Sequence, residues 1–405
     1  MEIIKIGLIR EGKTPPDKRV AFTPKQVEEI HQLFPNVKVV VQSSETRCFD
    51  DKEYKNAGAD IVLSVEDCDI LFGIKEVPID QLIADKTYLF FSHTIKQQPY
   101  NKKLLQTILQ KNITLIDYEA LKDSQGNRLV AFGRYAGIVG AYNALWTFGK
   151  KYSAFELRRA FECFDINDLK IELRKVTLPP IKIALTGSGR VAKGAMETLD
   201  TAGIRKVSAE DFLSKKYSEP VYVQLSSAEY HRHKRGLPFN RTDFHLAPEQ
   251  YESDFLKYGE VTDILIAGAY WNPKAPKLFE QQQLVNKKFQ IKIIADVTCD
   301  INGSISSTKK ASTIIEPLYD YHIESDSICS PLSQKENITV MAIDNLPCEL
   351  PRSSSEEFGR DLIDRIMNPI IYGKPEGIAT RATVAKAGKL TDNFSYLLDY
   401  VNNYE

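Results

Sequence analysis

The sequence has few of the features that mark several large classes of protein. Six cysteines are scattered over 405 residues without a C-x-x-C pair, which argues against a disulfide framework and against a cysteine zinc site. No apolar run is long enough to span a bilayer. The N-terminal segment Met1–Ile6 has the pattern of a strand rather than of a signal peptide. We therefore expect a cytoplasmic protein with reduced thiols and no membrane partner.

An excess of charge is also missing. The 53 Lys and Arg residues nearly balance 54 Asp and Glu residues, so the net charge is −1 and no bulk field draws the chain to nucleic acid. The basic run His231–Arg235 contains two histidines, but no third metal ligand is near them in the sequence. We interpret this run as a solvated basic loop and expect no metal site. The length of 405 residues and the 43% hydrophobic content are sufficient for two or three domains with hydrophobic cores.

The centre of the chain carries a nucleotide-binding pattern. The apolar run Ile181–Leu185 has the composition of a buried parallel strand, and the run Gly187–Ala192 after it fits G-x-G-x-x-A. Gly187 would permit the tight turn, and Gly189 would let the backbone approach a pyrophosphate at the start of the next helix. The predicted cofactor-binding residues of this turn are Gly187, Ser188, Gly189, Arg190 and Val191.

Strands and helices alternate on both sides of this turn, which predicts parallel sheets. We expect an α/β protein with two Rossmann-like, doubly wound parallel-sheet domains that face each other across a cleft. Residues 1–135 would begin a substrate domain, residues 136–346 would form an inserted dinucleotide-binding domain, and residues 347–405 would return to the substrate domain as helices. Within the first domain, Thr23, Pro24 and Gln26 have the spacing of a helix capping box. The predicted strands are 3–9, 37–41, 69–74, 87–91, 113–118, 205–209, 221–225, 263–267, 291–295 and 338–343, and a glycine-punctuated helix at 136–149 would join the two domains.

Ionisable residues follow several predicted strands, where open parallel sheets bind ligands. Taken singly, each residue has a simpler explanation than catalysis. A lysine or glutamate at a strand end is usually a solvated loop residue, a single histidine is usually structural, and an arginine often forms a surface ion pair. Their coincidence at one predicted rim favours a catalytic role for Lys75 and His93, and leaves carboxylate binding and surface pairing open for the arginines. The other members of this rim are Arg19, Glu76, Glu119 and Arg128 in the first domain, and Asp300 and Asp344 beside the nucleotide turn, both expected to be cofactor-binding.

Several motifs together resemble one family. "KRVAFTP" (18–24) is similar to an R-x-A-L-T-P signature and "GIKEVP" (73–78) to a lysine-bearing loop of the alanine dehydrogenase, transhydrogenase and saccharopine dehydrogenase superfamily. The chain looks closest to its lysine-forming saccharopine dehydrogenase, or lysine–2-oxoglutarate reductase, branch. The further matching motifs, in order, are "FFSHTIKQQPYN" (90–101), "LIDYEALKDSQGNRLVAFG" (115–133), "TGSGRVAKGA" (186–195), "GAYWNPKAPKLF" (268–279), "ADVTCDINGSI" (295–305) and "AIDNLPCELP" (342–351).

The resemblance implies an NAD(P)-dependent oxidoreductase that acts on a CH–NH group and interconverts saccharopine with lysine plus 2-oxoglutarate. Its partners would be these small molecules and, in some cases, further copies of itself. Lys75 and His93 match the acid–base pair of the family, and Glu119 matches a carboxylate that tunes the pair. The implied substrate-binding residues are Arg19, Arg128, Asp17, Glu76 and Asp344, where Asp344 would also lie near the nicotinamide, and Asp17 stands where many relatives have glutamate.

Two questions stay open in the sequence. The predicted second strand of the nucleotide domain, Arg205–Ala209, ends without the acid that reads a ribose hydroxyl, although Glu210 and Asp211 follow it and Arg205 and Lys206 begin it. We leave NAD or NADP open, with a lean toward NAD. The alternative functions are an alanine dehydrogenase-type enzyme, which would not need Arg128 and Glu119 together, and a soluble transhydrogenase-like subunit, which has no use for Lys75 and His93.

Overall fold

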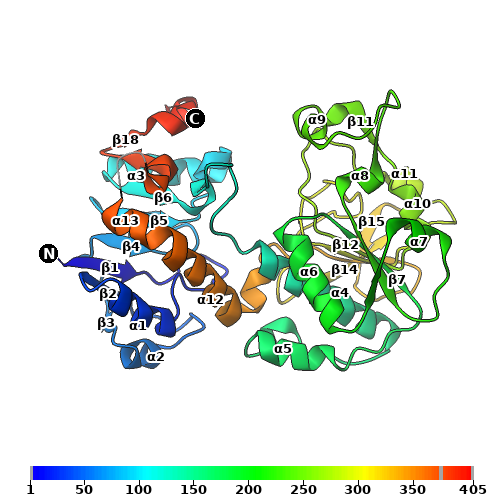
Figure 1. Ribbon diagram of the computed structural model, residues 1–405, viewed down its shortest axis with the longest axis horizontal. Coiled ribbons are helices and arrows are strands. Elements are labelled where there is room, and N and C mark those ends of the chain that lie inside the picture. Colours follow the sequence, from blue (N-terminus) through cyan, green and yellow to red (C-terminus); the bar gives the residue numbers. More distant parts are fainter. Residues whose placement is uncertain (1–2, 374–376, 403–405) are drawn as a thin grey trace. The chain divides into compact units, whose positions relative to one another are not determined.

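The computed structural model describes residues 3–373 and 377–402. Met1 and Glu2, the first two residues of the strand-like N-terminal segment, lie outside the described residues. The chain forms two compact units: residues 1–132 with 351–405, and residues 133–350. In Figure 1 the first unit carries the blue, cyan and orange-to-red ends of the colour scale and the second carries the green and yellow middle. The second unit is therefore inserted between the two segments of the first.

The first unit is built on an eight-stranded sheet in the order β18-β17-β6-β5-β4-β1-β2-β3. Strands β1 to β6 pair in parallel, as their separation by helices and long connections requires. The carboxyl ends of β1, β4, β5 and β6 therefore meet at one edge. The strands span β1 (Ile4–Leu8), β2 (Val37–Gln42), β3 (Asp60–Val62), β4 (Ile70–Phe72), β5 (Thr87–Phe90), β6 (Thr114–Asp117), β17 (Thr383–Lys386) and β18 (Lys389–Leu390).

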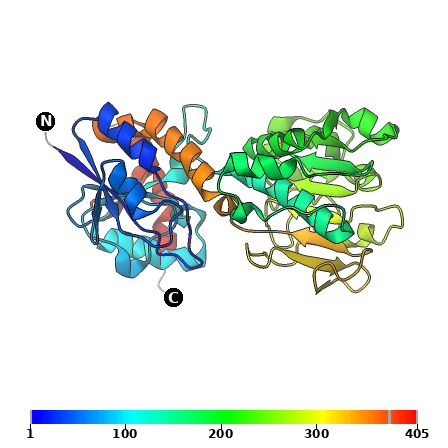
Figure 2. The same ribbon diagram turned by 90° about the horizontal axis from the view of Figure 1, so that it is seen from below.

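Helices cover the first sheet on both faces. The capping box predicted for α1 (Pro24–Leu33) is confirmed, because the Thr23 side chain accepts from the N–H of Gln26 and the Gln26 side chain accepts from the N–H of Thr23. Helix α12 (Pro351–Leu362) packs beside α1, as the orange and blue helices of Figure 2 show from below, and α15 (Leu398–Asn402) packs beside α3 (Lys102–Gln110). The remaining helices of this unit are α2 (Asp51–Asn56), α13 (Asn368–Tyr372), which continues α12 through a π-helical stretch at Ile363–Met367, and α14 (Ile378–Ala382).

The expectation that the C-terminal tail returns only as helices is wrong. Strands β17 and β18 form an antiparallel hairpin that extends the sheet next to β6. The two turn residues, Ala387 and Gly388, both have positive φ, which is the backbone of a tight hairpin turn. Val384 and Ala385 are fully buried. The strand was missed because its apolar stretch is only a few residues long.

The second unit also contains an eight-stranded sheet, in the order β15-β14-β16-β13-β12-β7-β9-β8. Strands β8, β9, β7, β12, β13 and β16 are parallel, and β14 and β15 add an antiparallel edge. The strand predicted to lie second, at Arg205–Ala209, is the edge strand β8, and β9 separates it from β7. The strands span β7 (Lys182–Thr186), β8 (Arg205–Val207), β9 (Val221–Leu225), β12 (Ile264–Ala267), β13 (Ile293–Asp296), β14 (Leu318–His322), β15 (Ser327–Cys329) and β16 (Ile338–Met341).

Two helices of the second unit touch through glycine. A Cβ atom on Gly137 of α4 (Gly133–Tyr152) would lie 1.8 Å from the carbonyl oxygen of Val191, and one on Gly194 of α6 (Arg190–Thr201) would lie 1.9 Å from that of Arg134. The helix that we expected to join the domains is therefore part of the core of the second unit. It packs directly on the helix that follows the nucleotide turn. The other helices on this unit's sheet are α5 (Ile166–Leu173), α7 (Ala209–Ser214) and α11 (Gln281–Leu284).

The interpretation of His231–Arg235 as a solvated loop is wrong. His231 and His233 belong to β10 (His231–His233), which pairs with β11 (Tyr251–Ser253), and both histidines are buried. The His231 ring lies 4.5 Å from the ring of Phe244, and burial lowers the pKa of His231 to about 4. Alternate residues of a strand face opposite sides, so Arg232 is exposed while its neighbours are covered. The short helices around this hairpin are α8 (Ser227–Tyr230), α9 (Arg241–Leu246) and α10 (Leu256–Gly259).

Among the described residues, no helix is both long and apolar enough to cross a membrane. In the same part of the chain, no three His, Cys, Asp or Glu side chains are grouped so that they could hold a metal ion.

Candidate active site

The residues predicted to be catalytic meet at the carboxyl edge of the first sheet. Lys75 and Glu76 follow β4, and His93 follows the neighbouring strand β5. His93 has a positive φ of 53°, a conformation that is uncommon outside glycine and that concentrates at functional sites. The Lys75 side chain is partly buried, and burial together with the nearby Arg19 charge lowers its pKa. A lysine that exchanges protons near neutral pH requires a shift in this direction.

Glu76 connects the two loops. Its Oε1 atom lies 2.5 Å from Nδ1 of His93, and its Oε2 atom accepts from the ammonium of Lys13 at 2.9 Å. Burial alone would raise the pKa of Glu76, but the hydrogen bonds from His93 and Lys13 lower it to about 2. The carboxylate is therefore ionised near neutral pH. Because it occupies Nδ1, the Nε2 atom of His93 is the one left for exchange with a substrate.

Glu119, at the end of β6, gathers two cations. Its Oε1 atom lies 2.5 Å from Arg128 and 3.1 Å from Lys96. Burial alone would raise the pKa of Glu119, but the charges of Arg128 and Lys96 hold it below the usual value. The second oxygen, Oε2, is buried and has no hydrogen-bond partner among the described residues. A buried carboxylate oxygen without a partner is costly, so this atom is a candidate contact for a ligand donor.

Arg19 and Asp17 form a pair of their own. The guanidinium donates from Nε to Oδ1 at 3.0 Å and from its terminal nitrogen to Oδ2 at 2.6 Å, and it lies 4.1 Å from the ring centre of Phe132. Arg19 is only 3% exposed and Asp17 only 2%, whereas the Arg128 and Lys96 side chains are 41% and 48% exposed. Direct carboxylate binding by Arg19 stays a prediction, and Arg128 and Lys96 are far more open to solvent than Arg19.

Glu11 is a member of this cluster that the sequence did not reveal. It follows β1, and its two carboxylate oxygens accept the backbone N–H groups of Ile74 and Lys75 at 2.6 and 2.9 Å. Burial and the charge of Asp17 raise the pKa of Glu11 to about 8. The same rule that selected the other residues, an ionisable group just beyond a strand, could have found it. It was overlooked because the turn Gly12–Pro16 after β1 reads as an ordinary loop.

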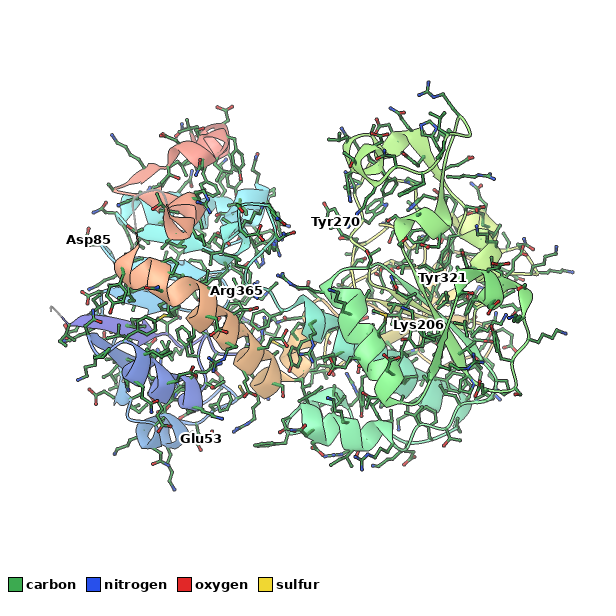
Figure 3. The ribbon with its side chains drawn as sticks, viewed as in Figure 1. Glu53, Asp85, Lys206, Tyr270, Tyr321 and Arg365 are labelled. Atoms are coloured by element: carbon green, nitrogen blue, oxygen red, sulfur yellow. The ribbon has the colours of Figure 1, made fainter. Side chains whose placement is uncertain are left out.

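The nucleotide turn borders a cavity of about 700 Å³ in the second unit. All five residues predicted for the turn, Gly187 to Val191, line it, together with Tyr270 in the loop after β12, which Figure 3 labels. Gly187 has a φ of 107°, as a glycine-only turn requires. Within residues 3–373 and 377–402, a Cβ atom on Gly189 would meet no protein atom within 4 Å, and the buried hydroxyl of Thr186 has no hydrogen-bond partner. Open backbone and an unpaired hydroxyl beside a helix start suit a pyrophosphate.

Asp300 and Asp344 lie at a different place in the second unit. They follow β13 and β16, both are exposed, and neither lines the cavity. Both lie near enough to Cys299 for their charges to act on it. Burial, and then the charges of Asp344, Asp296 and Asp300, raise the pKa of its thiol to about 12. The cofactor role predicted for Asp300 and Asp344 remains a prediction.

Strand β9, which pairs with β7, is not followed directly by an acidic residue of the kind that binds a ribose hydroxyl. Leu225 of β9 is followed by Ser226 and Ser227, which line the cavity, and Arg241 of α9 lines it as well. The nearest acid in sequence, Glu229, is hydrogen-bonded to the Ser226 hydroxyl. Glu210 and Asp211, the acids weighed in the sequence, follow the edge strand β8 instead.

Comparison with known proteins agrees with the motifs. The profile of the alanine dehydrogenase/PNT N-terminal domain matches residues 7–139. These residues are therefore similar to that domain. The chain that carries them is 28% identical to the mitochondrial alpha-aminoadipic semialdehyde synthase of Mus musculus, over 97% of this chain and 47% of the relative. It is 27% identical to the saccharopine dehydrogenase (NAD+, L-lysine-forming) of Emericella nidulans, over 90% of this chain and 91% of the relative.

Two solved structures share the fold of nearly the whole chain. An L-alanine dehydrogenase matches with a TM-score of 0.65 at 13% identity, over 98% of this chain and 100% of that one. A transhydrogenase from Sinorhizobium meliloti matches with a TM-score of 0.62 at 14% identity, over 96% and 100%. The chain spans about half the length of the semialdehyde synthases that it matches. The predicted superfamily, its saccharopine dehydrogenase likeness and the α/β class with two Rossmann-like sheets are confirmed.

Proposed function

We propose that the chain is an oxidoreductase of the lysine-forming saccharopine dehydrogenase type. It would interconvert saccharopine with lysine and 2-oxoglutarate, acting on a CH–NH group with a nicotinamide cofactor. The similarity to curated saccharopine dehydrogenases over about nine tenths of this chain supports the reaction class. The residues at the carboxyl edge of the first sheet support the substrate class.

The observation that carries the substrate assignment is the environment of Glu119. One of its oxygens pairs with Lys96 and Arg128, while the other is buried and has no partner in the part of the chain that the structure describes. A ligand that brings both an ammonium and carboxylates would satisfy the free oxygen and the two cations at once. Saccharopine carries three carboxylates and amine groups, so it matches this mixture of charge better than alanine, which offers a single carboxylate.

The proton transfers fall to Lys75 and His93. Imine formation from lysine and 2-oxoglutarate moves two protons from the neutral amine to the ketone oxygen, which leaves as water, and the reverse direction adds water to the imine carbon and returns these protons to the nitrogen. His93 would exchange protons at Nε2, since its Nδ1 is bonded to Glu76. Lys75, with its pKa lowered by burial and by Arg19, would serve as the second proton carrier. A bound nicotinamide would supply or accept the hydride at the imine carbon.

The cavity of the second unit suits the dinucleotide. Gly189 leaves room for the pyrophosphate, and Thr186 offers an unpaired hydroxyl beside it. A 2′-hydroxyl is usually read by an acid at the end of the strand next to the first one, and a 2′-phosphate by an arginine. Here that strand, β9, ends in Ser226 and Ser227, and Arg241 borders the same cavity. These observations favour NADP over the NAD toward which the sequence leaned. Tighter binding of NADPH than NADH in calorimetry would support this choice, and the reverse order would overturn it.

Replacement of Arg128 tests the substrate assignment. Arg128→Met removes a cation from Glu119 and should raise the Michaelis constant for 2-oxoglutarate or saccharopine much more than that for the nicotinamide. Arg365→Met is a matched control, because this arginine is similarly exposed and pairs with Asp361 within its own helical segment. An Arg128→Met enzyme with unchanged Michaelis constants for both organic substrates would contradict the assignment.

A further inference from the structure

Two buried carboxylates hold the loops that carry the proposed acid–base residues. The strands at this edge follow the order β6-β5-β4-β1, with Lys75 after β4 and His93 after β5. Of these four strands β1 and β6 are the outer two; Glu11 follows β1 and Asp117 is the last residue of β6. Each carboxylate reaches the loop after its inner neighbour.

Glu11 takes two N–H groups beyond the end of a ladder. The last backbone bond between β1 and β4 runs from the N–H of Ile9 to the carbonyl of Phe72 at 3.0 Å. The next groups on this side, the N–H groups of Ile74 and Lys75, go to the two oxygens of Glu11. Gly73 allows this approach, because a Cβ atom there would lie 2.7 Å from the Ile9 side chain. Glu11 thus takes the place that another strand residue would fill.

Asp117 acts in the same way on the other side. Its Oδ2 atom accepts from the backbone N–H of Ser92 at 3.2 Å and from the Ser92 hydroxyl at 2.5 Å, directly before His93. Its Oδ1 atom accepts from the backbone N–H of Glu119 at 2.7 Å. Asp117 is fully buried. One side chain therefore fixes both the start of the His93 loop and the residue that gathers Lys96 and Arg128.

We propose that Glu11 and Asp117 are positioning residues, which set the backbone of Lys75, His93 and Glu119 for the reaction without touching the substrate. The proposal rests on the proposed function for what the three residues do. The hydrogen bonds by which Glu11 and Asp117 hold the two loops, called the clamp below, do not depend on that function. Burial that raises the pKa of both carboxyl groups fits groups whose bonds are made to backbone rather than to water.

The test uses Glu11→Gln and Asp117→Asn in the full chain, because each amide keeps one acceptor oxygen and turns the other into a donor that opposes a backbone N–H. Asp69→Asn is the matched control. Asp69 also accepts a backbone N–H, that of Lys5, at 2.8 Å, but at the amino end of the same sheet. Hydrogen–deuterium exchange is read on peptides covering residues 70–78, 90–96 and 115–121, and turnover is measured with lysine and 2-oxoglutarate.

We expect exchange about ten- to a hundredfold faster in residues 74–75 for Glu11→Gln, and in residues 92 and 119 for Asp117→Asn. Turnover should fall about 10- to 100-fold, since small displacements of reacting groups are costly, while nucleotide affinity stays at the wild-type value. Unchanged exchange in these peptides would overturn the clamp whatever the enzyme's substrate. Faster exchange with wild-type turnover would overturn the positioning role. A wild-type chain without turnover counts against the proposed function alone, because exchange still decides whether the clamp exists.

Discussion

His93 Nδ1 lies 2.5 Å from Oε1 of Glu76, and Glu76 directly follows Lys75. The two loops that carry the proposed acid and base are thus joined by a single carboxylate, which is ionised because its pKa is lowered to about 2. The contact orients the His93 ring and decides which of its nitrogens can face a substrate. It also ties the loop that carries Lys75 to the loop that carries His93.

Removal of either proton carrier should stop most of the reaction. We expect Lys75→Met and His93→Gln each to lower turnover about 10²- to 10⁴-fold, the usual effect of losing a positioned acid or base. Nucleotide affinity should hardly change, because the cavity proposed to hold the dinucleotide is lined by other residues. Steady-state kinetics across the pH range provide the measurement. Lys86→Met, before the amino end of β5, is the control, and wild-type turnover in both site variants would show that the site lies elsewhere.

The glycine turn should be essential for nucleotide binding and dispensable for folding. At Gly189 a Cβ atom meets no protein atom within 4 Å, and φ is −85°, so Gly189→Val introduces bulk only where the pyrophosphate must approach. Calorimetric titration with NADPH and NADH should show a sharp loss of affinity in a protein with a wild-type circular dichroism spectrum. Gly189→Ala should lose less. Wild-type affinity in the valine variant would exclude this turn as the binding site.

The features that were predicted correctly are formed by residues close together in the sequence. The capping box at Thr23 and Gln26 lies within four residues, and the strand, glycine turn and helix around Gly187 follow one another directly, so both could be seen in the sequence. The fully parallel core of each sheet followed from alternation of strand and helix. These features need no knowledge of distant contacts.

Spatial order and burial could not be obtained in this way. Chain order makes β8 the second strand of its unit, but β9 is the strand that pairs with β7. An acidic residue that could bind a ribose hydroxyl was therefore sought after β8 instead of after β9. His231 and His233 looked solvated because Arg232, Lys234 and Arg235 surround them. Their burial depends on pairing with β11, nearly twenty residues away.

Burial of His231 should make the second unit sensitive to acid. Its pKa is about 4 in the fold and about 6.5 in an unfolded chain, so the unfolded state binds the extra proton between these values. Stability is therefore complete above about pH 6.5 and falls as the pH drops toward 4, by up to about 3 kcal/mol from this group.

Urea unfolding of the second unit's tryptophan signal, repeated from pH 7 to pH 4, measures this effect. His231→Phe should reduce the loss of stability with falling pH, because a phenylalanine in the cluster with Phe244 cannot be protonated. His245→Phe is the control, since His245 is exposed. Equal pH dependence in wild type and His231→Phe would show that protonation of this residue does not govern acid unfolding.

An absorbance assay of nicotinamide oxidation with the purified wild-type chain decides which reaction the protein catalyses. Two substrate pairs are compared at matched concentrations: lysine with 2-oxoglutarate, and ammonia with pyruvate. Because Glu119, Arg128 and Lys96 suit a ligand with several carboxylates and an amine, we predict rapid oxidation of the nicotinamide with the first pair and little with the second. Rapid oxidation with ammonia and pyruvate, and none with lysine and 2-oxoglutarate, would contradict the account and assign the chain an alanine dehydrogenase-type activity.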